Sequence, residues 1–138
     1  MTNMSWWVLK LEGHVQHVRI APTSHGYESF SILDFIKLVC KSKSDNYAIR
    51  LWPRLENKSE LEGLVVDVHF PIKSSKSPYK QPPTPTREGP ATTRMGLQKL
   101  LLVLGDKVKD EFRQVGDNAL NRFMLGDCSS IIQFDFTY

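Results

Sequence analysis

The sequence is poor in cysteine and in long apolar runs. Its 138 residues include two cysteines, Cys40 and Cys128, which are too few for the disulfide framework of a small secreted domain. The longest uninterrupted apolar run, Leu100 to Leu104, is far too short to span a bilayer. The N-terminus has no basic stretch followed by an apolar one, so we expect no signal peptide. These absences predict an intracellular protein, nuclear or cytoplasmic, with two reduced thiols and no membrane association.

Neither sign of charge dominates the chain. Eighteen lysines and arginines against fifteen aspartates and glutamates give a formal net charge of +3 and a pI near 8.9. This mildly basic balance permits contact with phosphates but does not require it. Hydrophobic residues make up 41% of the sequence, which excludes a disordered chain. At this length we expect residues 1–138 to form a single domain with a core of its own.

Catalytic and metal-binding motifs are also missing. No CxxC or HExxH spacing occurs, and His14 and His17, three residues apart on a predicted strand, would face opposite sides. There is no P-loop, dinucleotide fingerprint or GxSxG motif. Cys40 lies beside the apolar face of a predicted helix, where an inert thiol is usual, and no histidine adjoins Cys128. We therefore predict a protein that is not an enzyme, with no metal, no cofactor and no small-molecule substrate.

Alternating apolar residues predict strands near both ends and in the middle of the chain. Residues 4–20 are typical of a hairpin broken near Gly13, residues 64–70 of one strand, and residues 131–138 of a last strand. Between them, residues 73–91 hold five of the eight prolines together with several serines and lysines. This composition predicts a mobile loop, not a strand or a helix.

Helical periodicity predicts two short helices in the first half. Ser31 and Asp34 have the spacing of a capping box, in which the hydroxyl and the carboxylate each bind an amide at the helix start. Apolar residues then follow at i, i+3, i+4 and i+7. A second helix begins at Ser44 or Asp45, and its Pro53 predicts either a kink or a stop and restart.

The second half predicts a helical hairpin. A leucine-rich helix has Thr92 or Thr93 as its N-cap and ends at Gly105, and Asp106 caps a second helix that Gly126 ends. The expected fold is therefore α+β. It comprises a small, mainly antiparallel sheet, two short N-terminal helices, and a C-terminal helical hairpin packed against them.

Basic residues gather around the two early helices. Joined by a Lys-Ser-Lys-Ser turn, these helices have roughly the dimensions of a helix-turn-helix unit. Arg50 and Arg54 lie on a free helix face with Asn46 and Tyr47 at its N-terminal end, an arrangement suited to bidentate contacts with bases or phosphates. The alternative is an ordinary solvated helix face and loop. The candidate nucleic-acid-binding residues in this region and the loop are Lys41, Lys43, Asn46, Arg50, Arg54, Lys73, Lys76 and Lys80.

Three stretches resemble one family. Residues 29–36 (Ser-Phe-Ser-Ile-Leu-Asp-Phe-Ile) and 46–55 (Asn-Tyr-Ala-Ile-Arg-Leu-Trp-Pro-Arg-Leu) look like the front half of the BRO-N and KilA-N type domains of large DNA viruses, phages and some eukaryotes. Residues 93–113 resemble the second half, where a Gly-Leu-x-x-Leu-Leu helix leads into a Lys-containing turn and a helix with Phe-Arg. The likeness covers roughly residues 27–127, interrupted by the proline-rich stretch.

The resemblance implies an α+β DNA-binding module, with DNA favoured over RNA and a role in transcriptional or chromatin regulation. It supports Lys43, Arg50 and Arg54 again. The positions that it adds in the second half are Lys99, Lys107 and Arg113. The alternative is a protein–protein or homodimerisation module that uses the proline-rich loop or the aromatic residues of the terminal strands. These aromatic residues are Trp6, Trp7, Phe134 and Phe136.

Overall fold

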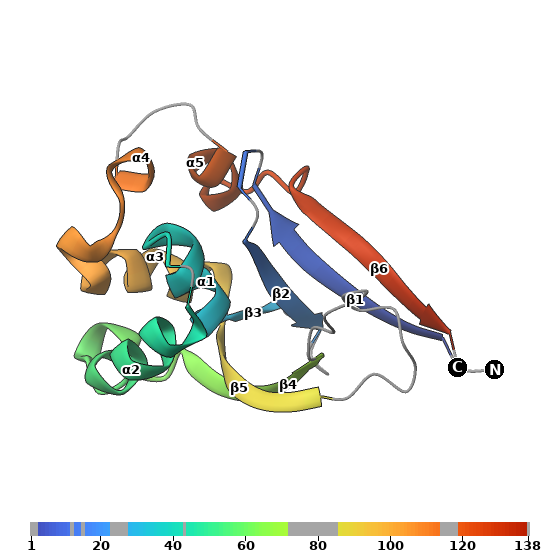
Figure 1. Cartoon of the computed structure of the whole chain (residues 1–138), viewed down its shortest axis with the longest axis horizontal. Helices are drawn as coiled ribbons and strands as arrows, with labels where there is room; N and C mark the ends of the chain where they lie inside the picture. The colour runs from blue at the N-terminus through green and yellow to red at the C-terminus, as the bar shows by residue number, and fades with distance from the viewer. Residues whose placement is uncertain are drawn as a thin grey trace.

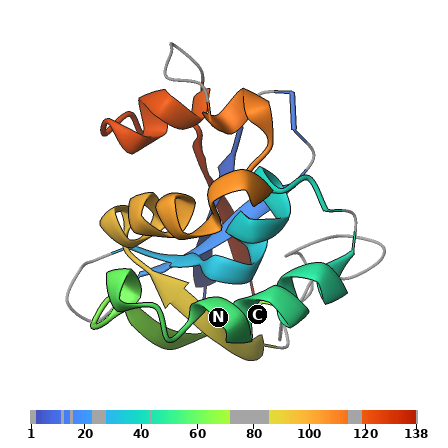
Figure 2. The same ribbon diagram turned by 90° about the vertical axis from the view of Figure 1, so that its left-hand side faces the viewer.

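A computed structural model describes residues 3–11, 13–14, 16–22, 28–42, 44–71, 86–113 and 119–137 of the chain, with backbone alone at residues 3–6, 22, 45, 71, 86 and 133–137. These residues form one antiparallel sheet with helices packed against it (Figure 1). In Figure 2 the helices stand in front of the strands. The expected α+β class with an antiparallel sheet is confirmed.

The sheet has six strands in the order β4-β5-β3-β2-β1-β6, and every neighbouring pair is antiparallel. Their bounds are β1 Asn3–Lys10, β2 His17–Pro22, β3 Glu28–Ser31, β4 Val65–Pro71, β5 Thr86–Thr92 and β6 Ile131–Thr137. The first and last strands pair along their length, from Asn3 opposite Thr137 to Leu9 opposite Ile131. The predicted N-terminal hairpin, middle strand and last strand are confirmed.

Strand β5 begins within the stretch predicted to be a loop and overlaps it at residues 86–91. That prediction is wrong for residues 86–91, while residues 73–85 lie outside the described ranges. Gly89 and Pro90 disfavour a strand in the sequence. The strand forms nonetheless, and its neighbour β3 pairs only with Ala91 and Thr92. No β3 residue therefore lies opposite Pro90, and its missing amide hydrogen breaks no bond on that side. The four-residue strand β3 was not predicted either.

Three of the helices begin at predicted caps. Ser31, Ser44 and Thr93 each accept a hydrogen bond from an amide of the first turn, at 3.2–3.3 Å. Helix α2 continues without a break through Pro53 to Leu55, so it does not stop and restart there. The helices are α1 Ile32–Val39, α2 Asp45–Leu55, α3 Arg94–Leu104, α4 Asp110–Arg113 and α5 Ala119–Met124, with 3-10 turns at Ser59–Leu61 and Gly105–Lys107.

The prediction for the C-terminal hairpin is wrong at the start of its second helix. Asp106 lies in a 3-10 turn, Val108 has extended backbone, and helix begins again only at Asp110. A long-range contact explains the break, because the Lys109 amide donates to the Val39 carbonyl at the end of α1, at 2.8 Å. This bond and the burial of Val108 outweigh the local helical tendency of the segment.

The main core fills the space between the helices and one face of the sheet. Phe35 of α1, Trp52 of α2 and Leu97 of α3 pack in one cluster with Leu9 and Phe30 of the strands. A smaller cluster on the opposite face consists of Val8, Ala21, Phe70 and Ala91. Among the helices in the described ranges, none has both the length and the apolar content needed to cross a bilayer. This packing buries one side of α2 and leaves its other side to solvent.

Candidate nucleic-acid interface

The outer side of α2 carries the arginines predicted from the sequence. The buried side of the helix consists of Ala48, Leu51, Trp52 and Leu55. On the solvent side, Asn46, Arg50 and Arg54 follow one another at intervals of four residues and are all exposed. Because residues four apart lie one above another on a helix, these three side chains form a polar row.

Arg50 and Arg54 border an open groove together with Lys107. We call this the basic groove; its volume is about 490 Å³, and it lies between α2 and the 3-10 turn that follows α3. None of the described residues that line it is acidic. In the described part of the chain, Arg50, Arg54 and Lys107 form no ion pair. The groove therefore concentrates three positive charges that no described carboxylate offsets.

A buried thiol lies next to the basic groove. Burial raises the pKa of Cys40, although a hydrogen bond from the Tyr47 hydroxyl and the charges of Lys109 and Lys107 act in the opposite direction. Burial and the contact with Cys40 also raise the pKa of Tyr47. Both groups are therefore neutral at pH 7, and neither adds negative charge to the groove.

Two of the predicted cations are compensated by neighbouring carboxylates. Lys41 follows α1 with a left-handed backbone (φ 52°) and forms an ion pair with Glu111. Arg113 lies 3.5 Å from Asp106 and 3.4 Å from Asp110. These pairs are exposed, so they contribute little stability, but they reduce the positive potential at both residues. The structure does not bring Lys41 or Arg113 into the basic groove.

The other predicted residues divide into two groups. Lys99 is exposed on α3 and does not line the basic groove. The residues that lie outside the described ranges are Lys43, Lys73, Lys76 and Lys80. The structure therefore brings together Asn46, Arg50, Arg54 and Lys107 of the predicted set.

A second recess lies on the other side of α2. Its volume is about 580 Å³, and its lining includes Lys37 of α1, Asn46 and Ile49 of α2, and Arg87 of β5. Asn46 therefore borders both the recess and the basic groove. Arg87 was missed by sequence reasoning because it lies in the stretch predicted to be a loop. The one available signal was that this stretch contains several basic residues.

The described histidines do not gather into a metal site. His14 lies 3.9 Å from Glu111 and against the ring of Phe112, and His69 lies 3.8 Å from Glu88. In the part of the chain that the structure describes, no three His, Cys, Asp or Glu side chains are placed to share an ion. The polar chemistry of this surface is therefore that of the basic residues around α2.

Comparisons of the chain with protein-family models, with curated proteins and with solved structures found no match. The resemblance to BRO-N and KilA-N domains therefore stays a prediction. Any functional assignment rests on the geometry of the groove and its charges.

Proposed function

We propose that the chain binds nucleic acid, with double-stranded DNA as the leading ligand, through the basic groove. The observation that carries this proposal is the convergence of Arg50, Arg54 and Lys107 on one open groove with no described carboxylate in its lining. Phosphate contacts from such side chains supply most of the affinity of sequence-independent binding. A role in transcriptional or chromatin regulation, implied by the family resemblance, remains part of the proposal.

The charge of the groove sets the expected dependence on salt. Each phosphate that is neutralised lowers the slope of log K against log salt by about 0.9 on B-DNA, so three contacts give a slope of about −2.7. Binding should then weaken about 40-fold between about 50 and 200 mM salt. This dependence distinguishes electrostatic docking from contacts that are mainly apolar.

The test is a salt titration with a fluorescent duplex of mixed sequence, followed by anisotropy. Arg50→Ala with Arg54→Ala should make the slope shallower by about 1.8. The matched control is Lys10→Ala with Arg122→Ala, which removes the same charge from exposed positions on β1 and α5 outside the groove. The control should leave the slope nearly unchanged. Absence of wild-type binding at low salt, or equal losses in both variants, would overturn the proposal.

One observation favours a second candidate, self-association. Among the described strands β6 has a single neighbour, β1, so it lies at an edge of the sheet. The register places Trp6 opposite Phe134 and Met4 opposite Phe136 along this edge. An apolar edge strand is a template for pairing with another chain. We propose a homodimer through β6 as the alternative function of this domain.

A further inference from the structure

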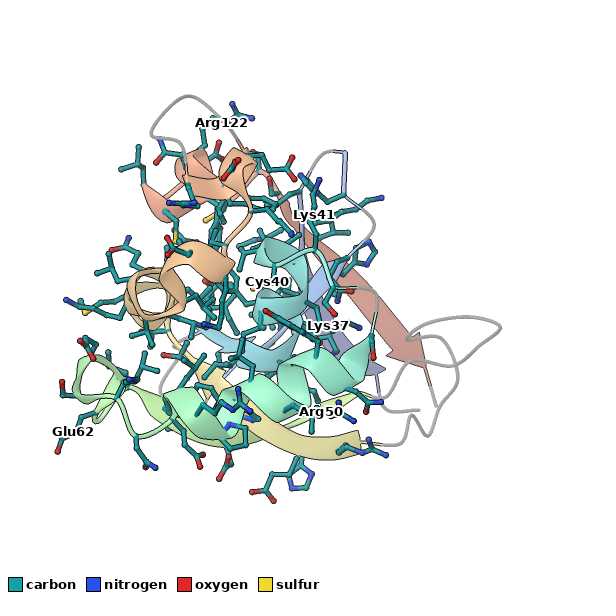
Figure 3. All side chains as sticks on the ribbon, turned by 60° about the vertical axis from the view of Figure 1, so that its left-hand side comes forward. Lys37, Cys40, Lys41, Arg50, Glu62 and Arg122 are labelled. Atoms are coloured by element: carbon teal, nitrogen blue, oxygen red, sulfur yellow. The ribbon has the colours of Figure 1, made fainter. Side chains whose placement is uncertain are left out.

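Helix α2 forms a ridge between the basic groove and the second recess. Asn46 borders both, Ile49 lies on the recess side, and Arg54 lies on the groove side with Arg50 between them. Figure 3 shows α2 across the front of the molecule, with Arg50 on it and Lys37 of α1 nearby. The first two turns of α2 are therefore accessible from both flanks.

Both flanks of the ridge carry positive charge. Arg54 and Lys107 border the basic groove, whereas Lys37 and Arg87 border the second recess. The recess also contains Asp34 and Glu88. Asp34 is held by Arg19 through two side-chain hydrogen bonds, and Glu88 lies 3.8 Å from His69. Arg19 therefore offsets the Asp34 carboxylate, and Lys37 with Arg87 outnumbers the remaining carboxylate of Glu88 in the recess.

The crest of the ridge has side chains suited to base edges. Asparagine pairs with the major-groove edge of adenine, arginine with that of guanine, and an apolar side chain contacts the thymine methyl group. Asn46, Arg50 and Ile49 offer these three chemistries on one exposed helix face, and Ile49 is 50% exposed. A surface that only follows phosphates gains nothing from an exposed isoleucine.

We propose that α2 enters the major groove of a B-form duplex and that its two basic flanks hold phosphates of the opposite strands. A helix with its side chains is about 10–12 Å across, and the major groove of B-DNA is about 12 Å wide. Phosphates line both walls of that groove, so a helix with cations on both sides meets each wall. This inference rests on the proposed function and specifies the ligand as duplex DNA that is read from the major groove.

The first experiment compares three duplexes of the same length and sequence. They are unmodified DNA, DNA whose cytosines carry glucosylated hydroxymethyl groups in the major groove, and RNA, whose major groove is too deep and narrow for side chains to read. Insertion of α2 predicts that the modified DNA and the RNA bind at least about tenfold more weakly at equal salt. Equal binding to all three would overturn the inference and leave electrostatic docking intact. No binding to any of them would overturn both.

The second experiment tests the two flanks separately. Arg87→Ala and Lys107→Ala should each make the salt slope shallower by about 0.9, and the double variant by about 1.8. Lys10→Ala is the control, because Lys10 is an exposed lysine of β1 that lines neither the groove nor the recess. If Lys107→Ala changed the slope and Arg87→Ala did not, docking would be one-sided. Insertion between two strands would then be wrong, and the proposed function would stand.

Discussion

Arg19 and Asp34 form a bidentate ion pair that joins β2 to the first turn of α1. The Arg19 Nε donates to Asp34 Oδ2 at 2.7 Å, Nη2 donates to Oδ1 at 3.0 Å, and the Arg19 amide donates to Oδ2 at 3.0 Å. The carboxylate is 7% exposed and the guanidinium side chain 19% exposed. The guanidinium also lies 5.3 Å from the centre of the Phe70 ring. This pair fixes α1, and with it Lys37, relative to the sheet.

Replacing Asp34 by alanine should destabilise the protein by about 3 kcal/mol, because the guanidinium and the amide of Arg19 lose an acceptor in a largely buried place. Urea unfolding followed by circular dichroism measures this change. The control is Glu88→Ala, which removes the exposed partner of His69 and should change stability by less than about 1 kcal/mol. Equal effects of the two substitutions would show that the buried pair does not hold α1.

Gly96 in α3 should not tolerate a methyl group. An added Cβ would overlap the Thr92 Oγ1 and lie 2.8 Å from the Thr92 Cβ. Thr92 cannot easily rotate away, because its hydroxyl donates to the Leu64 carbonyl at 2.7 Å. Gly96→Ala should therefore cost about 2 kcal/mol, although alanine favours a helix by about 1 kcal/mol. Gly89→Ala is the matched control in thermal unfolding: its Cβ would meet only Phe70 at 3.9 Å, and it should be nearly neutral.

The stability of the protein should fall as the pH rises above about 9. Burial raises the pKa of Cys40 above its ordinary value of 9.0. Above that pH the unfolded chain loses the thiol proton while the folded protein keeps it. The free energy of the unfolded state therefore falls relative to that of the folded state. The stability that depends on the protonated Cys40 thiol is complete below pH 9 and is lost as the pH rises towards the raised pKa of Cys40. Urea midpoints between pH 7 and 10 should decline less steeply in Cys40→Ala.

Cys128→Ala is the control for this pH dependence, because it removes the exposed thiol and leaves the buried one in place. Its pH profile should match that of the wild type. Tyr47→Phe should not reduce the decline in this range, because it removes the hydrogen bond that lowers the pKa of Cys40. Tyr47 itself starts from an ordinary pKa of 10.0, which is the upper end of the range. If the urea midpoint of Cys40→Ala declined with pH as steeply as that of the wild type, Cys40 would not be the cause of the pH dependence.

The features that could be predicted from the sequence depend on neighbouring residues. Ser31, Ser44 and Thr93 begin helices because each hydroxyl binds an amide two or three residues further on. Arg50 and Arg54 could also be placed from local sequence, because their spacing of four residues puts them on one helix face. Local rules of this kind require no knowledge of the rest of the chain.

The features that could not be predicted depend on distant partners. Asp34 has the spacing of a capping residue, but its carboxylate accepts from Arg19, fifteen residues away. The segment after Gly105 is helical by its pattern, but the Lys109 amide bonds to Val39. Arg87 becomes part of a candidate site only because β5 pairs with β4 and β3. A single sequence does not indicate which of these tertiary contacts prevails.

The alternative of self-association makes a separate prediction. If a second copy pairs with the free edge of β6, the mass measured by sedimentation should double with rising concentration. Phe134→Ala with Phe136→Ala should return it to that of a monomer, because the double variant removes two aromatic side chains from the edge strand. The control is Met95→Ala with Leu102→Ala, which removes exposed apolar side chains from α3, away from that edge. A monomer at all concentrations would exclude the dimer and leave nucleic-acid binding as the proposal to pursue.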